Sequence, residues 1–500
     1  MNELVILPLI IPLAAAGASL AAWGRRRVQR WLAVLGTGGL LVAAIALLVA
    51  VRQEGYLVVE VGGWPAPFGI VLVADVLSAI MVVLTGLIGF AVALYSLSTV
   101  EARHEAFGYF PLVQILLLGV CGAFLTGDIF NLYVWFEVML IASFVLLALG
   151  GRRSQIEGAL KYVTINLIAS VMFLVAAGIL YGLTGTLNMA DIALRLDALP
   201  APGLQTALAM LFLVAFGIKA AVFPLFFWLP ASYHTPPAAV SALFAGLLTK
   251  VGVYALLRTF TLVFDNDAEF THTLILIIAG LTMITGVLGA LAQREVRRIL
   301  SFLIIAGVGY MLMGIGLFSV LAITAAVFYL IHDMVVKTNL FLLGGVIRRI
   351  TGSYELARSG GLYAGYPALA VLFLVPALSL AGVPPFSGFM AKLGLVQAGL
   401  ADGQFLIVGV ALAVSLVTLL SMGRIWQEAF WKRLPEGTST DVQAPGRQLL
   451  RLSQLPIAML ALITVGIGIF GQPVFELAQA AALQLLEPAA YIEAVLGVQP

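Results

Sequence analysis

The fold of this chain is decided by residues 217–260, which read GIKAAVFPLFFWLPASYHTPPAAVSALFAGLLTKVGVYALLRTF. Two long apolar stretches meet here around a proline-rich turn, and each contains one lysine, Lys219 or Lys250. Pro224 follows Lys219 by five residues. A proline inside a helix removes a backbone donor and clashes with the preceding turn, so it opens or kinks the helix. The segment therefore predicts two membrane helices, the first of them broken, each with a cation at membrane depth.

The composition of the whole chain supports this interpretation. Of its 500 residues, 62% are hydrophobic and only 10% are charged, whereas soluble proteins carry roughly 25% charged residues. The sequence therefore predicts an all-α polytopic membrane protein in the cell membrane. The 26 basic and 24 acidic residues nearly cancel, which argues against a nucleic-acid-binding face. The single cysteine, Cys121, excludes a disulfide framework, and no nucleotide or metal motif is found, so no cofactor or bound metal is expected.

About fourteen spans are expected, each with the roughly 20 residues that cross a bilayer. They lie near residues 4–22, 31–51, 71–96, 108–126, 129–149, 158–183, 205–228, 237–260, 271–292, 298–318, 320–346, 367–398, 404–428 and 453–480. Most basic residues then fall in loops on one side of the membrane, with only Arg52, Arg195 and Arg258 on the other. Because positive loops face the cytoplasm, both termini are predicted on the outer side.

A second broken helix is expected in the twelfth span, where LAGVPPFSGFMAK places Pro384 and Pro385 just before Lys392. The two predicted breaks are five spans apart, which indicates two five-helix repeats of inverted topology, the usual arrangement around a transport path. The expected organisation is a three-helix segment (1–106), a first repeat (107–262), a second repeat (270–430), and a final part (431–500) with a cytoplasmic loop, the last span and a short outer tail.

Four of the six lysines lie inside predicted spans, at positions 219, 250, 337 and 392. Lysine at a helix centre costs roughly 2.5–3.5 kcal/mol on insertion scales, and its pKa shifts readily on burial. Glu137 lies near the middle of the fifth span, and His332 precedes Lys337 in the eleventh. Since four lysines cannot all be neutralised by one clear acid, these residues are predicted to carry protons. His234, in the loop between the seventh and eighth spans, is a candidate entrance. Asp75 and Asp128 are expected to be solvated, and His104 and His272 to lie at the surface.

Residues 217–260, the glutamate in span five and the two broken spans together resemble the antiporter-like subunits. These subunits occur in respiratory complex I, in membrane-bound hydrogenases and in Mrp cation/proton antiporters, and residues 226–258 look most like the D-type subunits of the Mrp antiporters. The resemblance implies one subunit of a hetero-oligomeric sodium/proton antiporter that moves protons through two half-channels.

The resemblance also implies roles for individual residues. Glu137 and Lys219 would form a buried ion pair, Lys250 would pass protons laterally, and Lys392 would release them. Both His332 and Lys337 stay candidates for the connecting position. Two alternatives also stay open: a proton-pumping subunit of a redox-driven complex, and a non-conducting scaffold.

Overall fold

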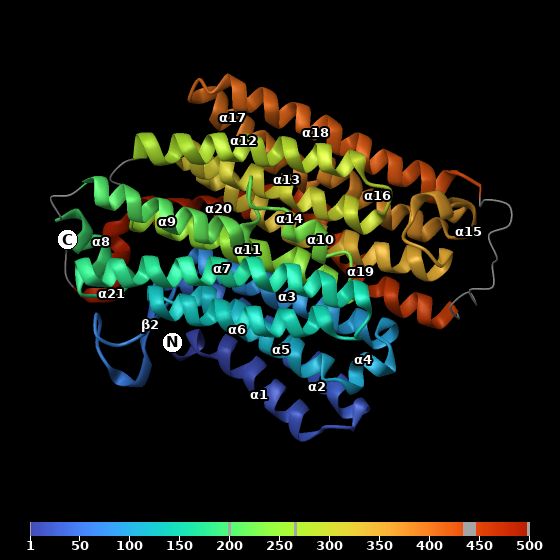
Figure 1. The fold of residues 1–500 in the computed structure, drawn as a ribbon, viewed down its shortest axis with the longest axis horizontal. Helices are drawn as coiled ribbons and strands as arrows, with labels where there is room; N and C mark the ends of the chain where they lie inside the picture. Colours follow the sequence, from blue (N-terminus) through green and yellow to red (C-terminus); the bar gives the residue numbers. More distant parts are fainter. Residues whose placement is uncertain (1, 199–201, 265–267, 434–446, 498–500) are drawn as a thin grey trace.

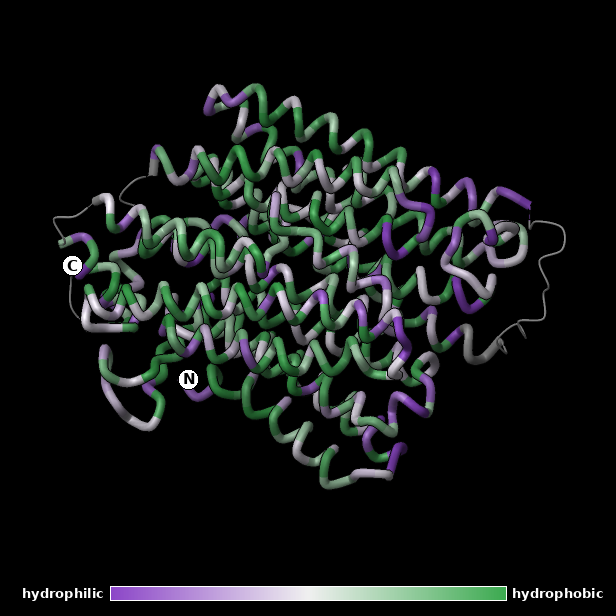
Figure 2. The backbone as a smooth tube through the Cα atoms, viewed as in Figure 1, coloured by the Kyte–Doolittle hydropathy of each residue, from purple (hydrophilic) through white to green (hydrophobic). Residues whose placement is uncertain are grey.

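The computed structural model describes residues 2–198, 202–264, 268–433 and 447–497, and they form a bundle of long helices lying side by side (Figure 1). Eleven helices in these ranges are long and apolar enough to cross a membrane, and three shorter apolar helices, Leu7–Ala21, Tyr109–Leu125 and Pro367–Ala381, lie among them. The prediction of an all-helical membrane protein is confirmed at this level. Hydrophobic residues cover most of the helix lengths, and hydrophilic ones gather toward the right-hand end of the bundle (Figure 2).

The N-terminal segment consists of α1 (Leu7–Ala21), α2 (Arg26–Glu54), β1 (Leu57–Glu60), β2 (Val71–Ala74), α3 (Val76–Thr99) and the short α4 (Ala102–Ala106). The two strands pair antiparallel, with Leu57 opposite Ala74. This hairpin corrects the sequence analysis, which placed residues 71–74 in the third span. The helix instead begins at Val76, because Asp75 caps it by accepting a hydrogen bond from the backbone nitrogen of Ser78.

The central part of the chain contains two series of helices. The first series is α5 (Tyr109–Leu125), α6 (Ile129–Ala148), α7 (Arg153–Thr184), α8 (Met189–Asp197), α9 (Pro202–Ala220), α10 (Trp228–Ser232) and α11 (Ala238–Leu262). The second is α12 (Ala268–Ala292), α13 (Val296–Leu317), α14 (Val320–Thr351), α15 (Leu362–Gly365), α16 (Pro367–Ala381), α17 (Ser387–Ala401) and α18 (Phe405–Trp426). The chain ends with α19 (Arg447–Ile469), α20 (Gly471–Leu486) and α21 (Pro488–Leu496).

The end of the chain differs from its prediction. A single span over 453–480 was expected, but the helix is interrupted at Phe470, which separates α19 from α20, and helical structure continues to Leu496 where a short tail was predicted. Helix α20 packs along α14. Both chain ends lie in the left half of Figure 1, and the short helices α4 and α15 lie at the right.

Burial separates the helices into an inner and an outer set. All of the apolar window of α11 is buried, as is 89% of the corresponding windows of α13 and α14, against 39% in α7, α12 and α18. The inner helices therefore have no face available to lipid. Polar side chains on them lie in the protein interior, where they need partners from neighbouring helices.

Both predicted helix breaks are present. Helix α9 stops at Ala220, and residues 221–227 form turns before α10. Groups freed by this break find partners, since the backbone nitrogen of Phe223 donates to Thr282 Oγ1 at 3.0 Å and Trp228 Nε1 donates to the Ile218 carbonyl at 3.0 Å. Helix α16 stops at Ala381, and Gly382 then adopts a left-handed conformation with φ +85°. Pro384 and Pro385 follow before α17 begins at Ser387.

Candidate functional site

The four predicted intramembrane lysines are all buried. Lys250 and Lys337 are 0% exposed, Lys219 is 5% exposed and Lys392 is 7% exposed. They come from the four elements expected, with Lys219 at the end of α9, Lys250 in α11, Lys337 in α14 and Lys392 in α17. Each ammonium group is held by a different set of contacts.

At the first break, a serine stands between Lys219 and Glu137. Ser170 Oγ donates a short hydrogen bond to Glu137 Oε1, and Lys219 Nζ donates to Ser170 Oγ at 2.9 Å and to the Asn166 carbonyl at 3.4 Å. The ammonium also lies 5.2 Å from the centre of the Phe136 ring. The expected pairing of Glu137 with Lys219 stays a prediction: in this structure the Ser170 hydroxyl lies between the two groups, and it can accept a hydrogen bond from one and donate to the other.

At the centre of the bundle, one carboxylate serves two lysines. Asp333 Oδ2 lies 2.8 Å from Lys250 Nζ, and Asp333 Oδ1 lies 3.9 Å from Lys337 Nζ. All three side chains are fully buried. Lys250 also donates to the Ala245 carbonyl at 2.6 Å and Lys337 to the Leu303 carbonyl at 2.7 Å. This arrangement, called the central triad below, joins α11 to α14 through opposite charges.

Small residues give the central triad its space. A Cβ atom at Gly307 of α13 would lie 2.8 Å from Asp333 Oδ1, and one at Gly246 of α11 would lie 2.3 Å from Thr338 Oγ1. A larger residue at either position would press on the Asp333 carboxylate or the Thr338 hydroxyl, which would have to move. The central triad thus lies where α11, α13 and α14 pack together. In the sequence, only isolated glycines indicate this close packing.

Beside the second break, His332 faces two serines. His332 Nδ1 lies 2.8 Å from Ser387 Oγ and 3.4 Å from Ser379 Oγ, and the two hydroxyls are 3.0 Å apart. Ser379 belongs to α16 and Ser387 to α17, so the imidazole reaches across from α14 to both halves of the broken helix. Its other nitrogen, Nε2, is buried without a hydrogen-bond partner. A Cβ atom at Gly388 would lie 1.8 Å from the Ser379 carbonyl.

Lys392 is held by the open end of α16. Its ammonium donates to the carbonyls of Leu380 and Ala381 at 2.9 Å and 3.3 Å, and to Ser415 Oγ of α18 at 2.7 Å. The last carbonyls of a helix have no partner within it and carry partial negative charge. The break therefore supplies acceptors for a buried cation without a carboxylate, which explains why Pro384 and Pro385 lie so close to Lys392.

His234 lies apart from these groups, in the turn before α11. Its Nδ1 is 2.8 Å from the Pro230 carbonyl and its Nε2 is 3.1 Å from Arg298 Nη2. Burial and the positive charge of Arg298 lower the pKa of His234 to about 4. The residue lines a cavity of about 440 Å³ that also contains Lys161 and Glu157. A cavity beside His234 fits the predicted entrance, which stays a prediction.

Several residues differ in burial or in their contacts from what the sequence predicted. Asp75 and Asp128 are 1% and 8% exposed, so the expectation that they are solvated is wrong, and both instead cap helices. His104 and His272 are also buried, at 5% and 4%. The contact of Asp333 with a lysine could have been predicted from the sequence, because Asp333 precedes Lys337 by four residues and both therefore lie on one face of a helix. Nothing in the sequence distinguishes Ser170, Ser379 and Ser415 from other serines in apolar helices, so their contacts with Lys219, His332 and Lys392 could not be predicted.

Comparisons with known proteins identify the family of this chain. The family model described as NADH:quinone oxidoreductase/Mrp antiporter, TM matches residues 126–418. The chain belongs to this family. Among curated proteins, it is 47% identical to the D-type subunit of the Na(+)/H(+) antiporter of Alkalihalophilus pseudofirmus over 499 residues, covering 99% of this chain and 100% of the relative. It is 42% identical to the protein of the same name from Bacillus subtilis, with the same coverage.

A solved structure shows the same fold. A chain in the Mrp complex from Dietzia sp. DQ12-45-1b matches with a TM-score of 0.91 and 34% sequence identity, covering 99% of this chain and 100% of that chain. The matched family region contains Glu137, Lys219, the central triad and Lys392. The resemblance found in the sequence is thereby confirmed: the chain is a member of this family, and its curated relatives are D-type antiporter subunits.

Proposed function

We propose that this chain is the proton-translocating subunit of a multisubunit Na+/H+ antiporter, in which it works together with other membrane subunits. The central triad carries the proposal most directly. A carboxylate between two fully buried lysines, 2.8 Å from one and 3.9 Å from the other, is a costly arrangement in a helix core because each ion must be desolvated. An arrangement of this kind at membrane depth is a functional-site hypothesis by default.

The proposed path has two halves that meet at the central triad. In the first half, protons pass between Glu137 and Lys219 through Ser170 and then reach Lys250. In the second half, Asp333 and Lys337 pass them toward His332, Ser387 and Lys392. Each helix break lies beside a lysine, so a small change at a break alters the contacts of a charged group. Both His332 and Lys337 are retained as connecting residues, since His332 faces the break and Lys337 faces Asp333.

The proposed topology follows the sequence. We propose fourteen spans with two inverted repeats, residues 107–262 and 270–430, after the three-helix segment 1–106 and before the final part 431–500, with both termini on the outer side of the cell membrane. Breaks in α9–α10 and α16–α17, each beside a lysine, support the repeat. We propose that sodium is handled together with partner subunits, because the curated relatives are named as single subunits of an Na(+)/H(+) antiporter.

The redox-driven alternative and the scaffold alternative are both less well supported. The two curated relatives are named as antiporter subunits and match over the full length, which favours cation/proton exchange over a redox complex. A protein that only holds its partner subunits together needs no buried lysines at its helix breaks or at the middle of the bundle. The buried Lys219, Lys250 and Lys392 therefore argue against the scaffold alternative.

The test is cation-driven proton movement in everted membrane vesicles from cells that lack their own antiporters. Glu137→Gln and Lys219→Ala are expected to abolish sodium-dependent proton release while the complex still assembles. The exposed ion pair of Lys432 with Glu428 offers the control, because Glu428→Gln lies outside the proposed path and should leave transport unchanged. Wild-type transport by either Glu137→Gln or Lys219→Ala at normal protein level would defeat the proposal.

A further inference from the structure

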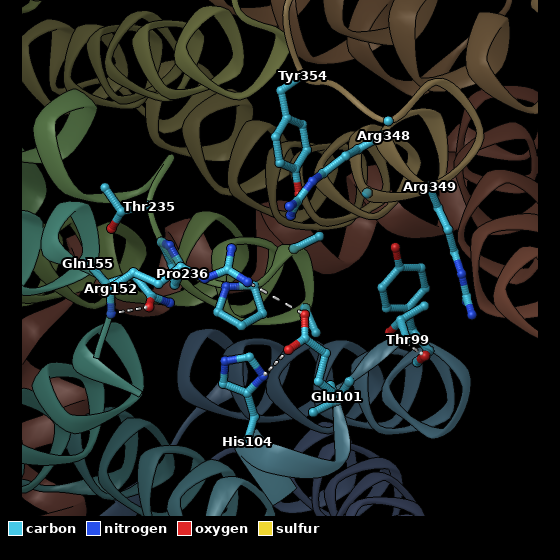
Figure 3. A pocket seen from close by; sticks show the side chains of 17 residues that line it. Thr99, Glu101, His104, Arg152, Gln155, Thr235, Pro236, Arg348, Arg349 and Tyr354 are labelled. Carbon is cyan, nitrogen blue, oxygen red and sulfur yellow. Dashed lines mark hydrogen bonds and ion pairs between the residues drawn. The ribbon is translucent and has the colours of Figure 1, made fainter. Parts of the chain in front are cut away.

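A second cavity, of about 450 Å³, lies away from the proton path, where α3, α4, α7, α11 and α14 come together (Figure 3). We propose that this cavity binds a phosphate group. The proposal does not depend on proton transport, because none of the residues of the proposed path lines the cavity.

Positive charge exceeds negative charge around the cavity. Arg152, Arg348 and Arg349 line it, and Glu101 is the single carboxylate among the described lining residues. Glu101 is only loosely engaged: its oxygens are 3.8 Å from Arg152 Nη2 and 3.9 Å from His104 Nδ1, and its side chain is 62% exposed. It therefore neutralises one of three guanidinium groups at most.

The guanidinium of Arg348 is available for a ligand. It lies 4.9 Å from the centre of the Tyr354 ring, and none of the ion pairs of the described residues includes it. Arg349 donates one hydrogen bond, from Nη1 to the Ser98 carbonyl at 2.7 Å, which leaves its other donors. A guanidinium has five N–H donors in a planar fork that matches phosphate oxygens two at a time.

His104 supplies a buried nitrogen that makes no hydrogen bond and has only the 3.9 Å contact with Glu101. Its side chain is 7% exposed, it lines the cavity, and its Nδ1 has no hydrogen-bond partner. Figure 3 shows the ring next to Glu101, which comes from the same short stretch of chain. An orphaned buried nitrogen is costly, and an anion in the cavity would satisfy it.

Two long helices also begin at the cavity. Helix α11, of 25 residues, starts at Ala238 after Pro237, which provides no side-chain cap, and both Ala238 and Ala239 line the cavity. Helix α7, of 32 residues, starts at Arg153, and its start is partly capped because the backbone nitrogen of Arg152 donates to Gln155 Oε1 at 3.2 Å. The first N–H groups of a helix have no partner within it and carry partial positive charge, which favours anions.

The C-terminus of α14 accounts for part of this charge only. Arg348 and Arg349 lie in its last turn, where cations complement the helix dipole. The helix dipole of α14 does not account for Arg152, His104 or the start of α11 without a side-chain cap, because these belong to other helices. Donors converge from several directions, which suits a tetrahedral anion better than a planar carboxylate. The phosphate is either free inorganic phosphate or the headgroup of an anionic phospholipid, since basic pockets between membrane helices bind such headgroups.

The experiment uses the assembled complex that contains this chain, purified in phosphate-free detergent buffer. One arm measures equilibrium binding of radiolabelled inorganic phosphate, and the other measures dioctanoyl phosphatidylglycerol against dioctanoylglycerol, which lacks the phosphate. The test variant is Arg348→Gln. Its matched control is Arg358→Gln, which also removes one arginine charge but at the exposed pair with Glu355 outside the cavity.

We expect saturable binding in at least one arm, weakened about tenfold or more by Arg348→Gln and unchanged by Arg358→Gln. Saturation by phosphate itself identifies a free-phosphate site, whereas saturation only by the phospholipid identifies a headgroup site. The proposal is overturned if the wild-type complex binds neither probe, or if both variants weaken binding equally. If Arg348→Gln fails to assemble, Arg348→Lys keeps the charge but loses the fork, and it should still weaken binding severalfold.

Discussion

Replacing Asp333 by asparagine tests the central triad directly. The change removes the charge shared by two lysines and keeps the size of the side chain. At an effective dielectric constant of about 20, an opposite charge at 2.8 Å attracts Lys250 by about 6 kcal/mol and one at 3.9 Å attracts Lys337 by about 4 kcal/mol. Desolvation offsets much of this attraction, and removing one partner of a buried pair destabilises a protein by about 3–5 kcal/mol.

The expected result for Asp333→Asn is loss of transport. Two buried ammonium groups without a counter-charge are unfavourable, so both lysines cannot be charged at the same time in this variant. Without the Asp333 carboxylate, no acidic group is left to pass a proton from Lys250 of α11 to Lys337 of α14. Sodium-dependent proton release per assembled complex in everted vesicles should be lost, and the amount of assembled complex should also fall, because about 3–5 kcal/mol is a large part of a protein's total stability. Asp402→Asn, at an exposed position after α17, is the control and should transport like the wild type.

A double variant separates function from folding. Asp333→Asn combined with Lys337→Gln removes one charge of each sign, so it should raise the level of assembled complex above that of Asp333→Asn alone without restoring transport. If Asp333→Asn alone transports at the wild-type rate and normal protein level, the central triad is not part of the path. If the double variant regains transport, Asp333 serves only to neutralise Lys337.

Contacts outside the triad lead to three further predictions. Ser170→Ala removes the hydroxyl between Glu137 and Lys219 and should lower sodium-dependent transport severalfold at normal protein level, with the exposed Thr285→Ala as control; unchanged transport contradicts the bridge. Gly388→Ala would place a methyl group 1.8 Å from the Ser379 carbonyl, so it should reduce the yield of folded complex, whereas Gly365→Ala meets nothing within 4 Å and should not; equal yields refute the tight packing at the break. The pKa of His234 is lowered to about 4 from an ordinary 6.5, so between these pH values the unfolded chain binds more protons at this residue than the folded chain does. The free energy of unfolding should therefore decrease as the pH falls from about 6.5 toward 4. His234→Gln should reduce the accompanying fall in melting temperature, and an identical fall in the variant would show that another group causes it.

The sequence determined the class of protein and the position of most charged groups. Long apolar runs can only be helices in a bilayer, since each backbone group must be satisfied within its own segment. Lys219, Lys250, Lys337 and Lys392 stand out in such runs because a charge there is costly. Prolines beside Lys219 and Lys392 likewise predicted both breaks, because the loss of a backbone donor is a local property of the chain.

The tertiary structure decided which of these groups meet. Ser170 lies 49 residues from Lys219, and Asp333 lies 83 residues from Lys250 (333 − 250), so periodicity within one helix could not pair them. The sequence therefore offered Glu137 as the one clear acid for the buried lysines, and neither Ser170 nor the pairing of Asp333 with Lys250 could be predicted from it. Helix packing brings α11 against α14 through glycines that leave room for the charges, and that packing depends on the shapes of all the helices at once.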